Sequence, residues 1–189
     1  MMGNMIDKLT RYLPFNEQEE NDKQEIIRRL KSGEELYERD NLSAHFTASA
    51  WVVSRDRKHV LMAYHNLYDS WAWLGGHADG EEDLLKVAIK EVKEESGLEN
   101  VKPVSEDIYS VEILAVAGHT KKGKYIPSHL HLNVTYLLEA DMGEALRNKP
   151  DENSQVGWFS LEDAIKASKE EWFKERIYNK LNEKLIMFK

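Results

Sequence analysis

The chain has 189 residues and a hydrophobic content of 41%, which is enough for one globular domain with a sizeable core. Its formal net charge of −8, from 34 acidic and 26 basic residues, argues against binding to duplex nucleic acid. The lack of cysteine excludes disulfides and thiol catalysis. No uncharged apolar run reaches the roughly 18 residues that a membrane span needs. We therefore expect a cytoplasmic protein that does not bind a membrane.

Residues 1–42 differ in composition from the rest of the chain, because they are highly charged and helix-like. Ile26, Ile27 and Leu30 form a narrow apolar stripe at helical spacing. We interpret this segment as an N-terminal helical extension, followed by a single domain over residues 43–189. The extension is expected to pack on the domain as an arm, and the alternative is a role in substrate specificity or dimerisation.

From residue 44 onward the pattern predicts strands, rich in β-forming residues and separated by turn residues. The segments are 45–54, 58–66, 71–76, 110–120, 128–140 and 156–160. Ser160, with Asp163 three residues later, predicts the start of a closing helix. Its apolar positions are Ala164, Ile165, Trp172, Ile177, Leu181 and Leu185. This order of elements favours an α/β fold with a mixed sheet flanked by helices.

The most informative segment is 76–98, GHADGEEDLLKVAIKEVKEESGL. The pair Gly75-Gly76 marks the end of a strand and a loop whose backbone can approach a ligand closely. A helix is expected beyond it, ending at Gly97, a residue suited to a left-handed position. One side of this helix should pack on the sheet through Leu85, Ala88, Ile89 and Val92.

Glu91, Glu94 and Glu95 fall on an arc of roughly 100° on that helix, away from the centre of the apolar stripe. Carboxylates at this spacing repel one another by a few tenths of a kcal/mol per pair, so a cation would stabilise them. Ligands that offer only oxygen favour Mg²⁺ or Mn²⁺. The alternative is a solvated acidic face without a metal ion.

The spacing of these residues resembles the signature of the Nudix hydrolases, G-x5-E-x7-R-E-U-x-E-E-x-G-U, in which U is aliphatic. Gly76 and Glu82 match its first two fixed positions, and the segment from Glu91 to Leu98 matches its end. Lys90 stands where the family has arginine. The resemblance extends over roughly residues 45 to 170 and implies a Nudix-type α/β/α sandwich.

The resemblance implies hydrolysis of a nucleoside diphosphate linked to another moiety, by water attack on phosphorus with a divalent metal ion as cofactor. Glu91, Glu94 and Glu95 match the metal-binding and proton-accepting positions of the family. The backbone carbonyl of Gly76 is commonly a further metal ligand. Lys90, with Glu82, matches the pair that buttresses the helix and orients a catalytic glutamate.

Lys90 is the departure from the family pattern, because lysine offers a point charge in place of a planar fork of donors. We expect weaker preorganisation of the glutamates rather than lost activity. The alternative function is a catalytically weak, Nudix-fold nucleotide-binding or sensor module. The resemblance, together with the N-terminal extension, also suggests a homodimer.

Glu152 lies in a loop before the last predicted strand, six residues before Trp158. Many members of the family place a glutamate here that completes the metal site or serves as the base. We therefore include Glu152 among the candidate catalytic and metal-binding residues. The alternative is that this stretch, rich in Asp, Asn and Pro, is simply a turn.

Histidines are unusually placed along the predicted strands. In the strand over 128–140, two of them alternate with leucines and so share one face. Several could converge on one cleft and donate hydrogen bonds to a phosphate or stack on a base. The H-x-H spacing also suggests zinc, and the simplest alternative is ordinary hydrogen-bonded strand histidines. The candidate substrate-binding residues are His45, His77, His119, His129 and His131.

Overall fold

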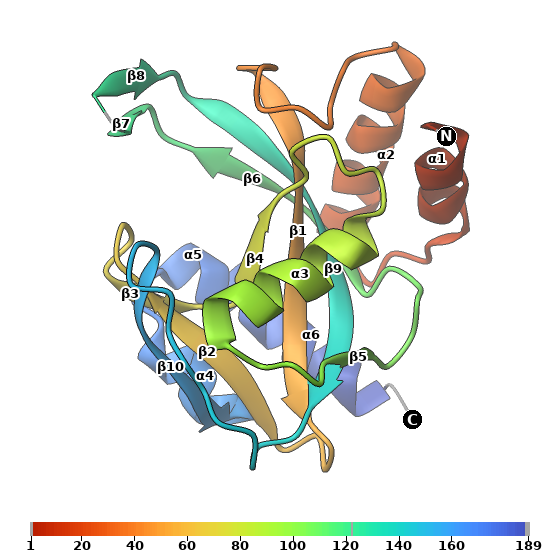
Figure 1. Ribbon diagram of the computed structural model, residues 1–189. Coiled ribbons are helices and arrows are strands. Elements are labelled where there is room, and N and C mark those ends of the chain that lie inside the picture. Colours follow the sequence, from red (N-terminus) through yellow and green to blue (C-terminus); the bar gives the residue numbers. More distant parts are fainter. Residues whose placement is uncertain (1, 122, 188–189) are drawn as a thin grey trace. The chain divides into compact units, whose positions relative to one another are not determined.

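A computed structural model describes residues 2–121 and 123–187 of the chain (Figure 1). Its contacts divide into two compact units. Unit 1 comprises Met1–Ser49, Gly76–Val87 and Glu106–Tyr136, and unit 2 comprises Ala50–Gly75, Ala88–Ser105 and Leu137–Lys189. Each unit is therefore assembled from segments that are far apart in the sequence.

Unit 1 begins with two helices, α1 (Met2–Arg11) and α2 (Glu17–Lys31). Asn16 caps α2, because its side chain accepts a hydrogen bond from the backbone N–H of Glu19. The apolar stripe predicted at 26, 27 and 30 is buried, which confirms the helical spacing. Helix α2 is joined to strand β6 (Ser110–Val116) by a hydrogen bond from the Ile113 N–H to Asp22.

A buried polar network connects the strands of unit 1. Asn133 accepts hydrogen bonds of 2.9 Å from Thr47 and from Ser49 on its amide oxygen. Its amide nitrogen donates to Glu112 and to Thr135, at 3.0 and 3.1 Å. Because both ends of this amide are used, its orientation is fixed by the surrounding groups.

The network continues from β6 to helix α2. Ser110 contacts Glu112 on its own strand and lies 2.6 Å from the carboxylate of Glu19. The same Glu19 accepts hydrogen bonds from the hydroxyl of Tyr12 and from the N–H of Phe15. The segment before residue 43 is thereby fastened to the strands of unit 1, as expected for a packing arm.

Strands β1 (Ala44–Ser54) and β9 (His129–Ala140) are the long strands of the sheet. They run parallel, because residue numbers rise together across the pair: the Leu130 N–H donates to the Ser43 carbonyl, and Asn133 meets Thr47 and Ser49. In contrast, β6 pairs with β9 in antiparallel register, with Val111 opposite Val134. The sheet is therefore mixed, as predicted.

The described residues form one eight-stranded sheet with the order β10-β2-β1-β9-β5, with β3 on β2, β4 on β1 and β6 on β9. A separate hairpin in unit 1 joins β7 and β8. The bounds of the remaining strands are β2 His59–His65, β3 Ser70–Ala72, β4 Leu74–His77, β5 Lys102–Pro103, β7 His119–Lys121, β8 Lys124–Ile126 and β10 Asn153–Ser160.

Unit 2 carries helices on both faces of its strands. Helix α3 (Leu84–Ser96) lies before the sheet in Figure 1, and the C-terminal helices lie behind it. On the rear face, Trp51 of β1 stacks on Tyr178 with ring centroids 5.6 Å apart. Trp73 meets the same tyrosine edge to face, so this tryptophan packs within the unit.

The prediction of one continuous closing helix from residue 160 is wrong. Ser160 does cap α4 (Leu161–Ala167), but Ser168 is extended and ends that helix. The break has a tertiary cause, because Ser70 contacts Ser168 and accepts a hydrogen bond from the Lys169 N–H. The chain then continues as α5 Glu171–Phe173, a π-helical turn η1 Lys174–Tyr178 and α6 Asn179–Met187.

Helix α3 ends where the sequence predicted, and its buried face is rotated from the predicted one. Gly97 has a φ of +74° just beyond the last helical residue. A Cβ atom at Gly97 would lie 2.9 Å from the Cβ atom of Arg147, so both the backbone conformation and the close approach require glycine. The buried positions are Leu84, Val87, Ala88, Val92, Glu95 and Ser96, whereas Leu85 and Ile89 are partly exposed.

The α/β class, the mixed sheet and the helices at the N-terminus are confirmed. Among the described residues, none of the helices combines the length and the apolar character that crossing a membrane would require.

Candidate active site

Unit 2 gathers four glutamates, which we call the acidic cluster: Glu91, Glu94, Glu95 and Glu152. The first three lie on helix α3, and Glu152 directly precedes β10. Burial is the main cause that raises the pKa of Glu91 and of Glu95, and the charge of Glu152 adds to both shifts. The structure thus brings the loop glutamate and the helical glutamates together.

Glu95 is the most buried member of the acidic cluster, with 5% of its surface exposed. It lies one turn beyond Val92 and continues the buried face of the helix, whereas the sequence placed it away from that face. Its carboxylate accepts a hydrogen bond of 3.1 Å from the backbone N–H of Gly75. Burial, followed by the charges of Glu91 and Glu152, raises its pKa to about 8, and the Gly75 hydrogen bond opposes that rise.

Glu91 and Glu94 contact the ammonium group of Lys90. The Nζ atom of Lys90 lies 3.5 Å from Glu91 and 3.7 Å from Glu94. Burial raises the pKa of Glu91, and the positive charge of Lys90 opposes that rise. Lys90 therefore acts on two carboxylates of its own helix as a single charge, without the two-pronged contact that arginine can make.

Lys149 is a component of the site that the sequence analysis missed. Its ammonium group lies 3.0 Å from the carboxylate of Glu152 and 3.4 Å from that of Glu94. It joins the loop to the helix and offsets part of the negative charge. The only local signal was its position three residues before Glu152, which does not identify a contact with a helix 55 residues away.

The loop that carries Glu152 is fixed by buried hydrogen bonds. Asn153, which is 1% exposed, donates from its amide to the backbone carbonyl of Glu95 at the end of α3. The amide oxygen of Asn153 accepts from the Lys149 N–H, and the carbonyl of Glu152 accepts from the N–H of Asn66. Glu152 is therefore held in place by backbone anchors on both sides.

Two other residues of the predicted motif lie in unit 1. Gly76 is in strand β4, directly after the glycine that contacts Glu95. Glu82 is exposed in the loop before α3. Burial, followed by the charge of Glu82, raises the pKa of Tyr37 to about 12.

Unit 1 also gathers five histidines, which we call the imidazole cluster: His45, His77, His119, His129 and His131. The ring centroids of His77, His129 and His131 lie 5.2, 4.9 and 5.1 Å from that of His45. His119 is at the edge, with its ring 6.2 Å from that of His129. Several of the candidate histidines therefore lie close together, and their role in binding a substrate stays a prediction.

Two rings of the cluster, those of His45 and His131, have a pKa lowered by their surroundings. Burial lowers the pKa of His131 to about 2, and the neighbouring His77 and His45 lower it further. Burial also lowers the pKa of His45. Arg39, which is ion-paired with Asp79, adds to both effects. These rings therefore present nitrogen lone pairs at neutral pH.

The two clusters differ in how closely their ligand atoms approach. The nitrogen atoms offered by His45, His77 and His131 all lie within 4.8 Å of one another. Among the described residues, this is the one set of three or more potential metal-ligating side chains that meets that spacing. In the acidic cluster, ammonium groups contact the carboxylates, with Lys90 near Glu94 and Lys149 near Glu94 and Glu152.

Comparison with known proteins identifies the chain's relatives. The family model of the NUDIX domain matches residues 44–181. No curated protein matches the sequence.

Several solved structures share the fold. An Ap4A hydrolase from C. elegans, crystallised as a binary complex, has 23% identity and a TM-score of 0.54, covering 76% of this chain and 96% of its own. A NUDIX family hydrolase from Clostridium perfringens has 24% identity and a TM-score of 0.53, covering 77% and 98%. The E. coli dihydroneopterin triphosphate pyrophosphohydrolase has 15% identity and a TM-score of 0.54, covering 77% and 97%.

The family match covers most of the chain and includes both the glycine-bounded helix and Glu152. The chain therefore belongs to the Nudix family of hydrolases, enzymes that cleave pyrophosphate bonds.

Proposed function

We propose that the protein hydrolyses the pyrophosphate bridge of a small nucleoside diphosphate derivative, with Mg²⁺ or Mn²⁺ held by the acidic cluster. The observation that carries this proposal is the burial of the Glu95 carboxyl group together with its raised pKa. A carboxyl group that is 5% exposed and has a pKa raised to about 8 requires a compensating charge to ionise at neutral pH. A divalent cation would supply that charge.

The residues present fit such an ion. All four side chains of the acidic cluster offer carboxylate oxygen, which Mg²⁺ and Mn²⁺ prefer. Lys90 and Lys149 supply two positive charges against four carboxyl groups, so the cluster has an excess of negative charge once Glu95 is ionised. The carbonyl of Gly76 is a further proposed ligand. Binding an ion requires the Lys149 ammonium group to give way, because it contacts Glu94 and Glu152.

The proposed chemistry assigns a task to each group. The metal ion, when bound, would neutralise the bridging phosphates and lower the pKa of a water molecule. Glu95 is held at a fixed place by the Gly75 N–H, and Glu152 by the anchored loop. One of the four glutamates accepts the proton from the attacking water. Lys90 orients Glu91 and Glu94 through its ion pairs.

The test is Glu95→Gln, which keeps the shape of the side chain and removes its charge. We expect the fold to persist and turnover to fall by about 100- to 10,000-fold, the usual contribution of acid–base groups. The matched control is Glu99→Gln, because Glu99 is exposed just beyond the end of α3. Equal turnover in wild type and Glu95→Gln would reject the assignment.

The substrate is best identified with a panel assayed in the presence of Mg²⁺. The panel includes nucleotide sugars, nucleoside triphosphates and dinucleotides. Ap4A and dihydroneopterin triphosphate belong in it, because two structural relatives are named for them. Release of phosphate or of a nucleoside monophosphate identifies the cleaved bond.

A second candidate function is a nucleotide-binding or sensor module that retains the fold and has little activity. The observation that favours it is Lys90, which replaces the arginine of the family pattern and makes only ion pairs longer than 3.4 Å with Glu91 and Glu94. Tight binding of a panel compound without any product would support this function. Faster turnover in Lys90→Arg would show that the weaker contact limits catalysis.

The division into an extension over 1–42 and a domain over 43–189 is part of the proposal. It is supported by the start of the family match at residue 44. The predicted cytoplasmic location and homodimer stay predictions.

A further inference from the structure

The imidazole cluster contains a buried nitrogen atom whose isolation calls for an explanation. Among the described residues, the Nε2 atom of His45 has no hydrogen-bond partner, and the side chain belongs to a residue that is 4% exposed. Leaving a buried polar atom unsatisfied costs on the order of 1–3 kcal/mol. Such an atom calls for a partner, either an ordered water molecule or a bound ion.

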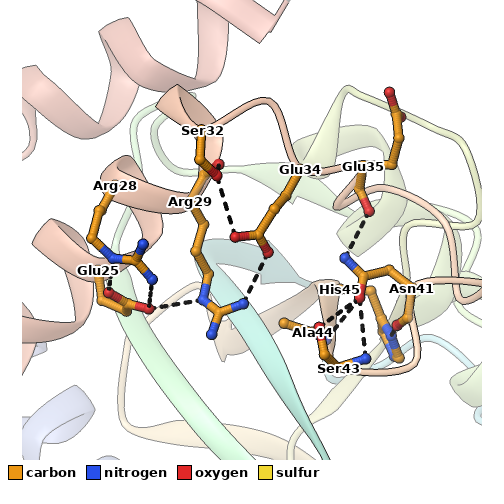
Figure 2. Close-up of polar contacts among 10 residues, drawn as sticks. All are labelled: Glu25, Arg28, Arg29, Ser32, Glu34, Glu35, Asn41, Ser43, Ala44 and His45. Carbon is orange, nitrogen blue, oxygen red and sulfur yellow. Dashed lines mark hydrogen bonds and ion pairs between the residues drawn. The ribbon is translucent and has the colours of Figure 1, made fainter.

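Hydrogen bonding fixes which nitrogen of His45 is available. Its Nδ1 atom lies 3.0 Å from the backbone carbonyl of Asn41, so Nδ1 must donate and carry the proton (Figure 2). In the neutral ring, Nε2 then presents a lone pair. A metal-binding histidine usually donates its second nitrogen to a carbonyl in this way, which fixes the tautomer and the ring orientation.

Asn41 is itself held firmly, so the orientation of His45 is set by the fold. The Asn41 side chain accepts hydrogen bonds from the N–H and hydroxyl groups of Ser43 and from the N–H of Ala44. It also donates to the backbone carbonyl of Glu35, as Figure 2 shows. This turn places a rigid carbonyl behind the ring.

The same logic applies to His129 and His131. The Nδ1 atom of His129 lies 2.9 Å from the carbonyl of Pro127 and must donate to it. The Nε2 atom of His129 therefore accepts, and its neighbour 3.1 Å away is the Nε2 atom of His131. If His131 donates this hydrogen bond, its Nδ1 atom presents the lone pair, and His129 serves as the outer partner.

The spacing and exposure of the rings suit a metal ion. The ligand atoms of His45, His77 and His131 lie within 4.8 Å of one another, and a tetrahedral ion at about 2.0–2.1 Å from each nitrogen would draw them somewhat closer. His77 and His131 are half-buried, so the ion can enter from solvent and keep a fourth position open. The charged groups at the cluster are Arg39 and Asp79, which pair with each other and largely cancel.

A phosphate group fits this cluster less well. Anion binding needs donors, whereas the Nδ1 donors of His45 and His129 already point at backbone carbonyls. Imidazole nitrogen lone pairs that converge in a half-buried site favour a metal cation, which accepts electron pairs.

We propose that His45, His77 and His131 form a zinc site, with donor chemistry distinct from that of the acidic cluster. The site is independent of the proposed hydrolysis. Three imidazoles with an open fourth position match the ligand sets that Zn²⁺ accepts, and Ni²⁺ or Co²⁺ would bind the same nitrogens.

The test uses the full chain, stripped of metal with EDTA and desalted. Titration with Zn²⁺ against a chromophoric indicator should show one equivalent bound by the wild type. His77→Asn and His131→Asn should each weaken binding by at least the roughly 10- to 100-fold that follows loss of an outer-shell partner. His59→Asn is the matched control, because His59 is a strand histidine of unit 2 and outside the cluster.

Two further measurements keep the test decisive. Glu95→Gln and Glu91→Gln should leave the zinc stoichiometry unchanged, and loss of zinc in these variants alone would place the ion at the acidic cluster and overturn the proposal. Long-range ¹H–¹⁵N spectra of the wild type should show shifts at the three ligand histidines on adding Zn²⁺. Spectra that respond to inorganic phosphate and not to Zn²⁺ would identify an anion site instead.

Discussion

The acidic cluster of unit 2 and the imidazole cluster of unit 1 use opposite means to hold polar groups inside a protein. In the acidic cluster, lysines counter part of the charge of Glu91, Glu94 and Glu152, and a backbone N–H contacts Glu95. In the imidazole cluster, burial lowers the pKa of His45 and His131, and backbone carbonyls select the proton-bearing nitrogen of His45 and His129. Charge balance therefore governs one cluster, and tautomer selection governs the other.

This difference teaches that the two clusters should prefer different ions. Carboxylate oxygens surrounded by ammonium groups suit a hard cation that arrives with the substrate. Neutral nitrogens already oriented by carbonyls suit a borderline-soft cation that resides in the fold.

The largest expected effect concerns metal exchange. Hydrolysis by EDTA-treated protein should fall at least about 100-fold, because the phosphates and carboxylates lose their counter-charge. Mg²⁺ or Mn²⁺ should restore it, whereas one equivalent of Zn²⁺ should not. Initial rates of product release provide the measurement. Restoration of activity by one equivalent of Zn²⁺ would show that hydrolysis does not need a separate Mg²⁺ or Mn²⁺ ion, and would contradict the different ion preferences of the two clusters.

The second prediction concerns the helix that carries three of the glutamates. Gly97→Ala should destabilise the fold by about 2 kcal/mol or more, because the left-handed backbone is strained and the new Cβ meets Arg147. Gly33→Ala is the matched control, since Gly33 has a φ of +79° and no heavy atom within 4 Å of the new Cβ. The free energy of unfolding of Gly33→Ala should fall by only about 1 kcal/mol, because this variant has the backbone strain without the close contact.

Denaturant unfolding measures both losses, and metal titration sharpens the result. Gly97→Ala should also weaken the apparent affinity for Mg²⁺, with zinc uptake unchanged. Equal destabilisation of the two glycine variants would show that the contact with Arg147 contributes nothing.

The third prediction follows from the pKa of Glu95 in metal-free protein. The folded pKa is raised to about 8 from an ordinary value of 4.5, so between these values the folded state holds a proton that the unfolded state has lost. Rising pH therefore favours unfolding across this window, by on the order of 1 kcal/mol per pH unit. Thermal unfolding in EDTA between pH 5 and 8 should show this slope, and Glu95→Gln should flatten it. An identical slope in both proteins would contradict the assignment.

The smallest expected effect concerns Lys149. Replacing its ammonium group in Lys149→Met should tighten Mg²⁺ binding by about 3- to 10-fold, since one competing positive charge near Glu94 and Glu152 is removed. Lys93→Met is the control, because Lys93 is an exposed lysine of α3, the helix that carries Glu94. The Mg²⁺ concentration at half-maximal activity reports the change. Weaker binding in Lys149→Met would instead show that the lysine holds the loop in its binding position.

The sequence predicted features that depend on local rules. Strand alternation located β1, β2, β6 and β9, and Gly97 located the end of α3, because each depends on side-chain periodicity or on backbone strain within a few residues. The break in the closing helix could not be predicted in this way. Ser168 leaves the helical conformation where it meets Ser70, and no proline or glycine marks the place.

The candidate site shows the same division. The grouping of Glu91, Glu94 and Glu95 could be predicted from their spacing because they share one helix. The burial of Glu95 was not, since it depends on the N–H of Gly75 reaching the helix from a strand. The contact of Lys149 with Glu94 was equally hidden, because it joins groups that only tertiary folding brings together.

The amide of Asn133 has a consequence for the alignment of the strands. All four of its hydrogen-bonding positions are used, two by Thr47 and Ser49 and two by Glu112 and Thr135. A slip of β9 by two residues would remove the Asn133 amide from the buried carboxylate of Glu112 and from Thr47 and Ser49, and each buried group left unsatisfied costs on the order of 1–3 kcal/mol. The hydrogen bonds of this one asparagine therefore favour a single register of β9. That register also fixes the positions of the other side chains on the same face of the strand, including the histidines two and four residues before Asn133.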